Sequence, residues 1–303
     1  MKLPAALRAW AYLARRIQAP GATRVAASLA SRLLEPGRVY RSPDGLALRV
    51  DPGDVYQAAM VLGLYEVRQL GTMRRLLTPE STVIDVGGHL GLYALVAARQ
   101  VGRGGAVHSF EPDPRLAARL REHVRLNRMD WVCVNELALA ERTEPRARLY
   151  LADQLGWSSL VPGTATGATE IEVPQRSFDD YAREVSLDPS EISFIKIDVE
   201  GAELSVLQGM SATLRASRAA VMVEVSGPRL RTQGASPRAV VDLMAALGYY
   251  PRLAGVRQRR AVLAALSDSK DPGAHDVLFA KPPAAANPCR AHPGSDGTEP
   301  PAD

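Results

Sequence analysis

Cysteine is almost absent from this 303-residue chain, which contains only Cys133 and Cys289. Neither belongs to a paired-cysteine motif, which excludes a metal site built from thiolates and argues against a structural disulfide. No run of 18 uncharged apolar residues occurs, so we expect no transmembrane helix. Arg8 interrupts the first apolar stretch, which argues against a cleaved signal peptide. Together these absences favour a cytoplasmic protein.

The composition is that of an ordinary globular protein, with 46% hydrophobic and 23% charged residues. The net charge of +4 is unevenly distributed, because residues 1–50 hold nine basic and two acidic side chains and the remainder has a slight acidic excess. A basic excess confined to one end argues against a nucleic-acid partner. We expect a basic helical extension over residues 1–37, one main domain over 38–281, and a disordered Pro/Ala-rich tail over 282–303.

The first 17 residues predict an amphipathic helix with arginines outside most of its apolar stripe. That stripe consists of Leu3, Leu7, Trp10, Leu13, Ala14 and Ile17. Three interpretations remain open for residues 1–34. They are peripheral contact with a membrane surface, which would place a cytoplasmic protein at the bilayer, docking on the main domain, and a contribution to a homodimer.

From Thr82 onward, predicted strands alternate with predicted helices. A hairpin over residues 38–50 and a helical stretch over roughly 55–77 come first. Strands are then expected at 82–86, 106–111, 132–139, 192–199, 220–226 and 277–280. This alternation predicts an α/β fold with a doubly wound, mostly parallel sheet. In such sheets ligands bind at the carboxyl ends of the strands, so the chemistry is expected in the turns that follow them.

The first of these turns, Asp85-Val86-Gly87-Gly88-His89-Leu90-Gly91, lets a ligand approach the backbone at a helix N-terminus. The next strand ends in Glu111, whose carboxylate suits the two hydroxyls of a ribose. The turn does not fit the G-x-G-x-x-G pattern of dinucleotide-binding proteins. Asp85 would repel a phosphate and attract a sulfonium. The pattern therefore favours S-adenosylmethionine as the cofactor.

Three blocks of sequence together resemble the FkbM-type methyltransferases, over about residues 45–281. They are Asp85–Gly91, Phe110-Glu111-Pro112 and Ile195-Lys196-Ile197-Asp198-Val199-Glu200-Gly201-Ala202-Glu203. The third block is the most specific. Gly88-His89 stands where the family usually has Ala-Asn, and residues 1–44 lie outside the resemblance. The resemblance implies a class I, Rossmann-like methyltransferase with a seven-stranded sheet that uses S-adenosylmethionine.

The resemblance also implies which residues hold the cofactor. Asp85, Gly87, Gly88, His89 and Gly91 would surround its methionine part, and Glu111, followed by Pro112, would hold the ribose. Asn135 and Ala138 would lie near the adenine. Tyr65 and Glu66 would help to close the site from the N-terminal side. Asp198 would lie at the end of the fourth strand, where such enzymes place cofactor-binding, substrate-facing and catalytic groups.

Three residues are candidates for the general base that removes the acceptor's hydroxyl proton: Asp198, Glu200 and His89. Asp198 has an alternative role as an ion-pair partner of Lys196. A second hypothesis places a divalent cation such as Mg²⁺ on Asp198, Glu200 and Glu224, because Mg²⁺ prefers oxygen ligands. Acceptor contacts are expected from an aromatic residue beside small hydroxyls, which suits a sugar or polyol ring: Trp157, Ser158 and Ser159.

The sequence therefore predicts an O-methyltransferase that acts on a hydroxyl of a small molecule or glycan. A nicotinamide-dependent oxidoreductase on a similar sheet is one alternative, although the missing G-x-G-x-x-G pattern weighs against it. A non-catalytic module that only binds the cofactor is another, although the intact Asp85, Glu111 and Asp198 argue against it.

Overall fold

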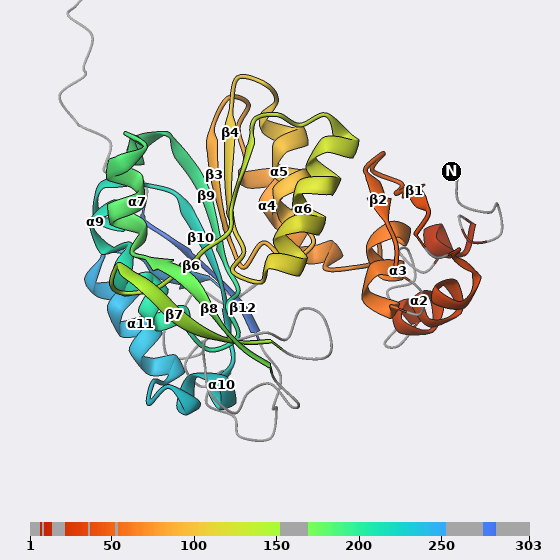
Figure 1. Ribbon diagram of the computed structural model, residues 1–303. Coiled ribbons are helices and arrows are strands. Elements are labelled where there is room, and N and C mark those ends of the chain that lie inside the picture. Colours follow the sequence, from red (N-terminus) through yellow and green to blue (C-terminus); the bar gives the residue numbers. More distant parts are fainter. Residues whose placement is uncertain are drawn as a thin grey trace, which may run out of the picture.

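A computed structural model describes residues 7, 9–13, 22–35, 37–51, 54–151, 169–252 and 275–282. Its centre is a seven-stranded sheet in the order β11-β12-β10-β9-β3-β4-β5 (Figure 1). The strands in that order are β11 (Tyr250–Arg252), β12 (His275–Ala280), β10 (Ala220–Val225), β9 (Ile192–Ile197), β3 (Thr82–Val86), β4 (Ala106–Phe110) and β5 (Val132–Asn135). The pairs from β10 to β5 are parallel, whereas β12 is antiparallel to both β10 and β11.

The strand order reverses at β3, because the chain runs outward through β4 and β5 and then returns to β9 on the other side. Such a reversal opens a crevice at the carboxyl ends of β3 and β9. The first strand, β3, is buried along its whole length, as expected for a parallel strand covered on both faces. The predicted doubly wound, mostly parallel α/β sheet is therefore confirmed.

Helices cover both faces of the sheet, and each face has its own buried apolar cluster. One face carries α4 (Val67–Leu76), α5 (Leu92–Val101) and α6 (Pro114–Asn127) (Figure 1). The other carries α7 (Phe178–Glu184), α8 (Glu203–Gly209), α9 (Ser211–Ala216) and α11 (Pro237–Ala246). The 3₁₀ turn η1 (Pro189–Glu191) precedes β9, and α10 (Gly227–Thr232) follows β10.

Local sequence signals fix several helix boundaries. The Asp113 carboxylate accepts a hydrogen bond from the Arg115 backbone N–H at 2.9 Å, and Pro114 occupies the first turn of α6. Ser236 caps α11 in the same way, through the Ala239 N–H, and Pro237 follows it. In both helices a capping side chain followed by proline therefore sets the first turn.

The expectation of one strand over residues 132–139 is wrong. The chain breaks after Asn135, and β6 (Ala138–Leu139) leaves the main sheet. It pairs with β8 (Thr169–Arg176), which is also hydrogen-bonded to β7 (Glu144–Leu151), in a separate three-stranded sheet. Both segments are apolar and extended, so their pattern predicts a strand but not its partner.

The expectation of one helical stretch over residues 55–77 is also wrong. Helix α3 (Val55–Leu62) ends at Gly63, whose φ of 64° makes a left-handed cap. Glu66 adopts a second left-handed conformation, with φ of 45°, immediately before α4. Two left-handed residues in four redirect the chain, and they place Tyr65 and Glu66 in the bend between the two helices.

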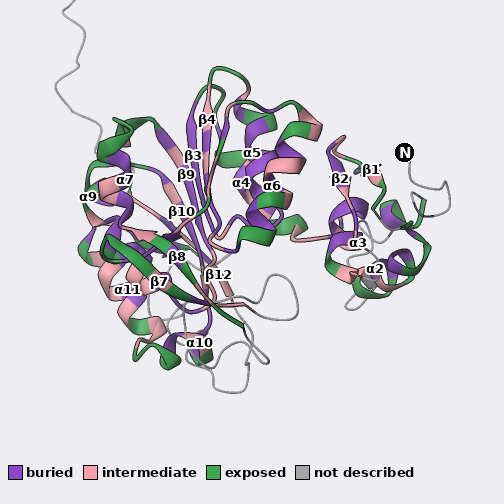
Figure 2. Ribbon diagram, viewed as in Figure 1, coloured by how far each residue is buried: buried purple, intermediate pink, exposed green. Residues whose placement is uncertain are grey.

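The N-terminal elements pack beside α6, away from the main sheet (Figure 1). They are the helix α2 (Ala22–Leu33), the predicted hairpin of β1 (Val39–Arg41) and β2 (Ala47–Arg49), and α3. Their buried residues, purple in Figure 2, belong to the same apolar cluster as those of α4, α5 and α6. None of the helices that the structure describes combines the length and the apolarity needed to cross a bilayer.

Candidate active site

The predicted glycine turn follows β3 at the point where β3, β4 and β9 meet. The backbone N–H groups of Gly87 and Gly88 both donate to the Phe110 carbonyl at the end of β4, at 3.0 and 2.9 Å. Gly87 has φ of 83°, and a Cβ there would lie 1.8 Å from the Asp198 carbonyl oxygen. Gly87 therefore lets the end of β9 approach the turn, which brings Asp198 close to it.

Asp85 is a buried carboxylate at the end of β3. It is 2% exposed, and it accepts a hydrogen bond from the Ser109 hydroxyl on the neighbouring strand β4 at 3.0 Å. Burial raises the pKa of Asp85 to about 6, although the Ser109 hydrogen bond and the Lys196 ammonium oppose that shift. A buried anion in this position favours a cationic ligand group over a phosphate.

Glu111 is buried at the end of β4 and is 6% exposed. One carboxylate oxygen accepts the His89 N–H at 2.7 Å, and the other accepts the Asp113 N–H at 2.9 Å. These bonds fix the carboxylate against the glycine turn and leave one acceptor position on each oxygen for ligand hydroxyls. Burial raises the pKa of Glu111 to about 7, against the opposing effect of the two backbone N–H groups.

His89 holds a left-handed backbone conformation in the turn, with φ of 49°. Its Nε2 is buried and has no hydrogen-bond partner within the protein. Burial lowers the pKa of His89, so the neutral imidazole predominates near neutral pH. A buried polar atom without a partner is costly, and it indicates a position that a ligand group satisfies.

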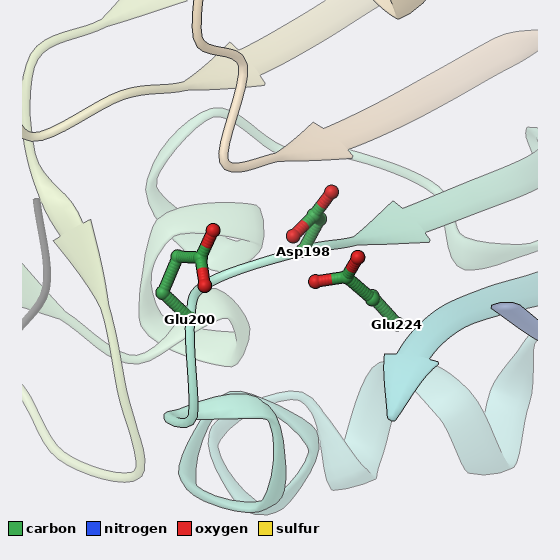
Figure 3. A group of neighbouring side chains, drawn as sticks. All are labelled: Asp198, Glu200 and Glu224. Carbon is green, nitrogen blue, oxygen red and sulfur yellow. The ribbon is translucent and has the colours of Figure 1, made fainter. Parts of the chain in front are cut away.

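Three carboxylates meet at the carboxyl ends of β9 and β10: those of Asp198, Glu200 and Glu224 (Figure 3). One oxygen from each lies within 4.8 Å of the others. Asp198 directly follows β9, its N–H donates to the Val86 carbonyl at 3.0 Å, and Glu200 lies two residues further on with φ of 55°. The structure thus brings together Asp198, Glu200 and Glu224 as the sequence predicted, and Asp198 lies beside the glycine turn.

Two cations neutralise part of this charge. Lys196 is 2% exposed, and its ammonium lies 2.7 Å from Asp276 Oδ1 and 3.6 Å from Asp198 Oδ2. The Arg229 guanidinium forms ion pairs with Glu200 and, at 3.3 Å, with Glu224. Burial alone would lower the pKa of Lys196, but the surrounding carboxylates outweigh it and raise the pKa, so Lys196 stays charged.

More carboxylates than cations are present, and protons make up the difference. Burial and the neighbouring Asp198 raise the pKa of Glu224 to about 9, and the two side chains are hydrogen-bonded to each other. Burial raises the pKa of Glu200 to about 7, against the attraction of Arg229. Glu224 therefore releases its proton less readily than an ordinary glutamic acid, and it shares a hydrogen bond with Asp198.

The predicted Mg²⁺ site rests on the oxygens of Asp198, Glu200 and Glu224. Carboxylate oxygens are the donors that Mg²⁺ prefers. Arg229 already pairs with two of the three carboxylates, and the Asp198–Glu224 hydrogen bond uses another oxygen. A cation would have to displace these partners, so the metal stays a prediction.

Glu66 lies in the bend between α3 and α4 and accepts a hydrogen bond from the Tyr93 hydroxyl. Burial raises the pKa of Glu66, although Lys196 and the Tyr93 hydrogen bond oppose that shift. Burial followed by the Glu66 charge raises the pKa of the neighbouring Tyr65, whose phenol therefore stays neutral. These interactions place Glu66 near Lys196 and Asp198, on the side of the site predicted to close over the cofactor.

The other predicted contact residues lie in different settings. Asn135 ends β5, and its amide donates to the Ser109 carbonyl at 3.3 Å. Ala138, 2% exposed on β6, packs with Leu149 and Val173 in the small sheet, and Pro112 joins β4 to α6. Trp157, Ser158 and Ser159 lie outside the described residues. The roles of all these residues in binding stay predictions.

Asp276 and Arg229 belong to the site, but sequence reasoning did not identify them. Asp276 lies opposite Glu224 because β12 runs antiparallel to β10, and it also accepts the Gln69 amide at 2.8 Å. Arg229 comes from α10. One signal could have found Arg229: it follows the end of a strand, where functional turns are expected. Nothing in the sequence linked Asp276 to Lys196, which lies 80 residues earlier.

The sequence pattern of the methyltransferase FkbM domain matches residues 85–251, which is more than half of the chain. The protein belongs to the FkbM methyltransferase family. The resemblance drawn from the three blocks of sequence is thereby confirmed. The matched segment contains the glycine turn, Glu111 and the carboxylate group, so this is an S-adenosylmethionine-dependent methyltransferase domain.

Curated relatives of this FkbM domain are methyltransferases. The chain is 28% identical over 180 residues to the 2-O-methyltransferase NoeI of Sinorhizobium fredii, which covers 55% of this chain and 72% of that protein. It is 23% identical over 148 residues to methyltransferase 1 of Beauveria bassiana, which covers 43% of this chain and 59% of that protein. The match with the Beauveria protein thus leaves more than a third of that protein uncovered.

Solved structures with a similar arrangement include two methyltransferases. One is the methyltransferase FkbM from Methylobacillus flagellatus, with 16% identity and a TM-score of 0.37 over 86% of this chain and 60% of that one. The other is an S-adenosylmethionine-dependent O-methyltransferase from Thermotoga maritima, with 12% identity and a TM-score of 0.43 over 81% and 78%. The fold class itself follows from the strand order described above.

The described residues fit the cofactor of this family. Asp85 and Glu111 offer buried carboxylates at the ends of adjacent strands, for a cationic group and for ribose hydroxyls respectively. Between them the glycine turn presents the buried, unpartnered His89 Nε2. The predicted cofactor residues Asp85, Glu111 and His89 therefore converge on one end of the sheet.

Proposed function

We propose that the protein transfers the methyl group of S-adenosylmethionine to a hydroxyl oxygen of a small molecule or glycan. The supporting observation is the half-buried Asp198, which lies beside the glycine turn, 3.6 Å from the Lys196 ammonium and hydrogen-bonded to Glu224. When bound, the cofactor supplies an electrophilic methyl group on a sulfonium. The acceptor's O–H and the S–CH₃ bonds break, the new C–O bond forms, and S-adenosylhomocysteine leaves.

In this proposal Asp198 takes the hydroxyl proton. Its carboxylate directly follows β9, on the same edge of the sheet as the turn where the methyl donor would bind. Removing the proton as the C–O bond forms contributes typically 10²- to 10⁴-fold to the rate. Lys196 and Glu224 are positioning residues, because both contact the Asp198 carboxylate, at 3.6 Å and through a hydrogen bond.

The other two candidate bases are less suitable in this geometry. Glu200 pairs with Arg229 and lies two residues beyond Asp198, whose backbone N–H is bonded to the Val86 carbonyl at the start of the glycine turn. His89 lies in the glycine turn, with its N–H bonded to Glu111 and its Nε2 without a partner in the protein, so its position fits contact with the cofactor better. We therefore assign the base to Asp198, Glu200 to positioning and His89 to binding.

The acceptor class rests on two supports. NoeI, a relative at 28% identity, is named a 2-O-methyltransferase, which is consistent with a hydroxyl acceptor. The sequence also places Trp157 next to Ser158 and Ser159, a combination suited to stacking on and hydrogen bonding to a sugar or polyol ring.

Membership of the FkbM family argues against the nicotinamide-dependent alternative. A cytoplasmic location and the lack of a nucleic-acid partner stay predictions from composition.

Cofactor binding is tested by titration of the full-length protein with S-adenosylhomocysteine in a calorimeter. We expect saturable binding that weakens at least tenfold in Glu111→Ala, because the carboxylate that would accept the ribose hydroxyls is lost. Glu184→Ala, exposed at the end of α7, is the matched control and should bind normally. Folded protein that does not bind, or equal binding by both variants, would contradict the proposal.

The base is tested by comparing Asp198→Asn, Glu200→Gln and His89→Gln in turnover on hydroxylated acceptors. We expect Asp198→Asn to lower kcat by 10²- to 10⁴-fold while the affinity for S-adenosylhomocysteine changes only a few-fold. Glu200→Gln should cost less than tenfold in kcat, and His89→Gln should mainly weaken cofactor binding. Cofactor binding without turnover on any acceptor would favour a non-catalytic module.

A further inference from the structure

Helix α2 is apolar on the side that faces away from the protein. Val25, Leu29 and Leu33 are 54%, 45% and 64% exposed. They are spaced four residues apart, so they form one stripe along three turns of the helix. Exposed leucines occur singly on most surfaces, whereas an ordered row of three calls for an explanation.

The opposite side of α2 already completes the fold. Ala26, Ala27, Ala30 and Leu34 are at most 5% exposed, and they belong to the apolar cluster shared with the hairpin and α3. Figure 2 shows both buried and exposed segments along this helix. The outer stripe is therefore not needed to hold α2 in place.

The helical residues before α2 also expose large apolar side chains. Residues 9–13 are helical, and Trp10 and Leu13 are 40% and 49% exposed, while Ala11 is buried in the same cluster as α2. Of the eleven exposed large hydrophobic residues in the described part of the chain, six lie between Trp10 and Leu33. The exposed apolar side chains of the protein are thus concentrated at its N-terminal end.

The charge of this surface has one sign. Arg24 and Arg32 are exposed on α2, each one residue before a member of the stripe, and α2 contains no acidic residue. The first 34 residues contain six basic residues and no acidic residue: Lys2, Arg8, Arg15, Arg16, Arg24 and Arg32. An apolar stripe flanked by arginines complements a surface with anionic groups above an apolar layer, which is the interface of an anionic lipid bilayer.

We propose that the outer face of α2, formed by Arg24, Val25, Leu29, Arg32 and Leu33, binds anionic membrane surfaces. The apolar side chains would enter the boundary between headgroups and acyl chains, and the arginines would contact lipid phosphates. A nucleic acid would match the charge but would leave the stripe exposed. A second copy of the chain would cover the stripe but would bring the arginines of both copies together. This proposal does not depend on the methyl acceptor.

The test is flotation of full-length protein with vesicles of phosphatidylcholine, alone and mixed with phosphatidylglycerol. We expect binding to the mixed vesicles that weakens as salt is added. Leu29→Glu should weaken it at least about tenfold, since a buried leucine contributes roughly that much. Arg24→Gln and Arg32→Gln should each weaken it about fivefold.

Val185→Glu is the matched control, because Val185 is 43% exposed at the end of α7, outside the proposed surface. Equal melting temperatures and equal affinity for S-adenosylhomocysteine would show that both glutamate variants are folded. The proposal is supported if Leu29→Glu loses vesicle binding and Val185→Glu retains it. The proposal is overturned if the native protein does not float with the vesicles, or if both variants lose vesicle binding equally. It is also overturned if the native protein is a dimer that does not bind vesicles and Leu29→Glu only makes it monomeric.

Discussion

At the scale of single residues, neighbouring protein atoms leave no room for a side chain at two positions of the glycine turn. A Cβ at Gly87 would overlap the Asp198 carbonyl, and one at Gly88 would lie 2.2 Å from the Ser109 hydroxyl oxygen. The sequence indicated that these positions admit a ligand close to the backbone. The structure adds that Gly87 lets two strand ends meet, which places the proposed base beside the turn.

Gly87→Ala should therefore lower the free energy of unfolding by more than the strain of a positive φ alone would. Gly234 is the matched control, because its φ of 67° is also positive but a Cβ there would have nothing within 4 Å. We expect Gly234→Ala to cost about 1–2 kcal/mol, the strain of the left-handed conformation. Gly87→Ala should cost several times more, or displace Asp198 and abolish turnover. Equal thermal shifts in the two variants would refute the close approach.

At the scale of elements, a buried histidine connects the N-terminal hairpin to the glycine turn. His123 on α6 is 1% exposed. Its Nε2 accepts the Arg49 backbone N–H from β2 at 3.0 Å, and its Nδ1 donates to the Leu90 carbonyl in the turn at 2.8 Å. The two bonds coexist only with the neutral imidazole, because a protonated ring still donates to Leu90 but has no acceptor for the Arg49 N–H.

This arrangement makes stability depend on pH in a known direction. Burial lowers the pKa of His123 in the folded state, whereas an unfolded histidine titrates near 6.5. Below that pH the unfolded chain binds more protons, so the contribution of His123 to stability is present above about pH 6.5 and is lost as the pH falls. The difference in free energy of unfolding between native protein and His123→Leu should shrink from pH 7.5 to pH 5.5.

Urea unfolding at several pH values measures that difference. Near pH 7.5 the variant should be less stable by about 2 kcal/mol, because two buried backbone groups lose their partner. Leu33→Ala, on the exposed side of α2, removes no titratable group, so it is the control and should leave the pH dependence unchanged. A gap between native protein and His123→Leu that is constant across this range would exclude the proposed titration.

At the scale of the whole molecule, the N-terminal elements and one face of the sheet share a single buried cluster. Leu48 on β2 is 2% exposed in that cluster, and Arg49 and Asp51 form ion pairs with Glu122 and Arg119 on α6. The hairpin thus contributes to the same core as α5 and α6. We infer that the hairpin and the methyltransferase domain unfold together.

Leu48→Ala should lower the free energy of unfolding by about 3 kcal/mol. Because the core is shared, circular dichroism and tryptophan fluorescence should report the same shifted midpoint; Trp131, which donates to the Ala98 carbonyl beside the sheet, is one of the reporters. Leu33→Ala, at 64% exposure, should change stability by less than about 0.5 kcal/mol. Two separate transitions in Leu48→Ala would show that the hairpin unfolds independently.

The sequence by itself determined the features that depend on neighbouring residues. Strand and helix periods, the Asp113-Pro114 cap and the glycine turn at Gly87 are local, so the order of the elements, the parallel sheet and the methyltransferase family could be read directly. Asp85, Glu111 and Asp198 were also found this way, because each ends a predicted strand and strand ends meet at one edge of the sheet.

Only the tertiary structure decided what depends on partners far apart in the chain. The extended residues 132–139 divide between two sheets because hydrogen-bonding partners, not extended conformation, define a sheet. Lys196 pairs with Asp276, and Arg229 with Glu200 and Glu224, because packing β12 and α10 against β9 and β10 buries these charges together. Buried charges need partners, and the fold, rather than the local sequence, supplies them.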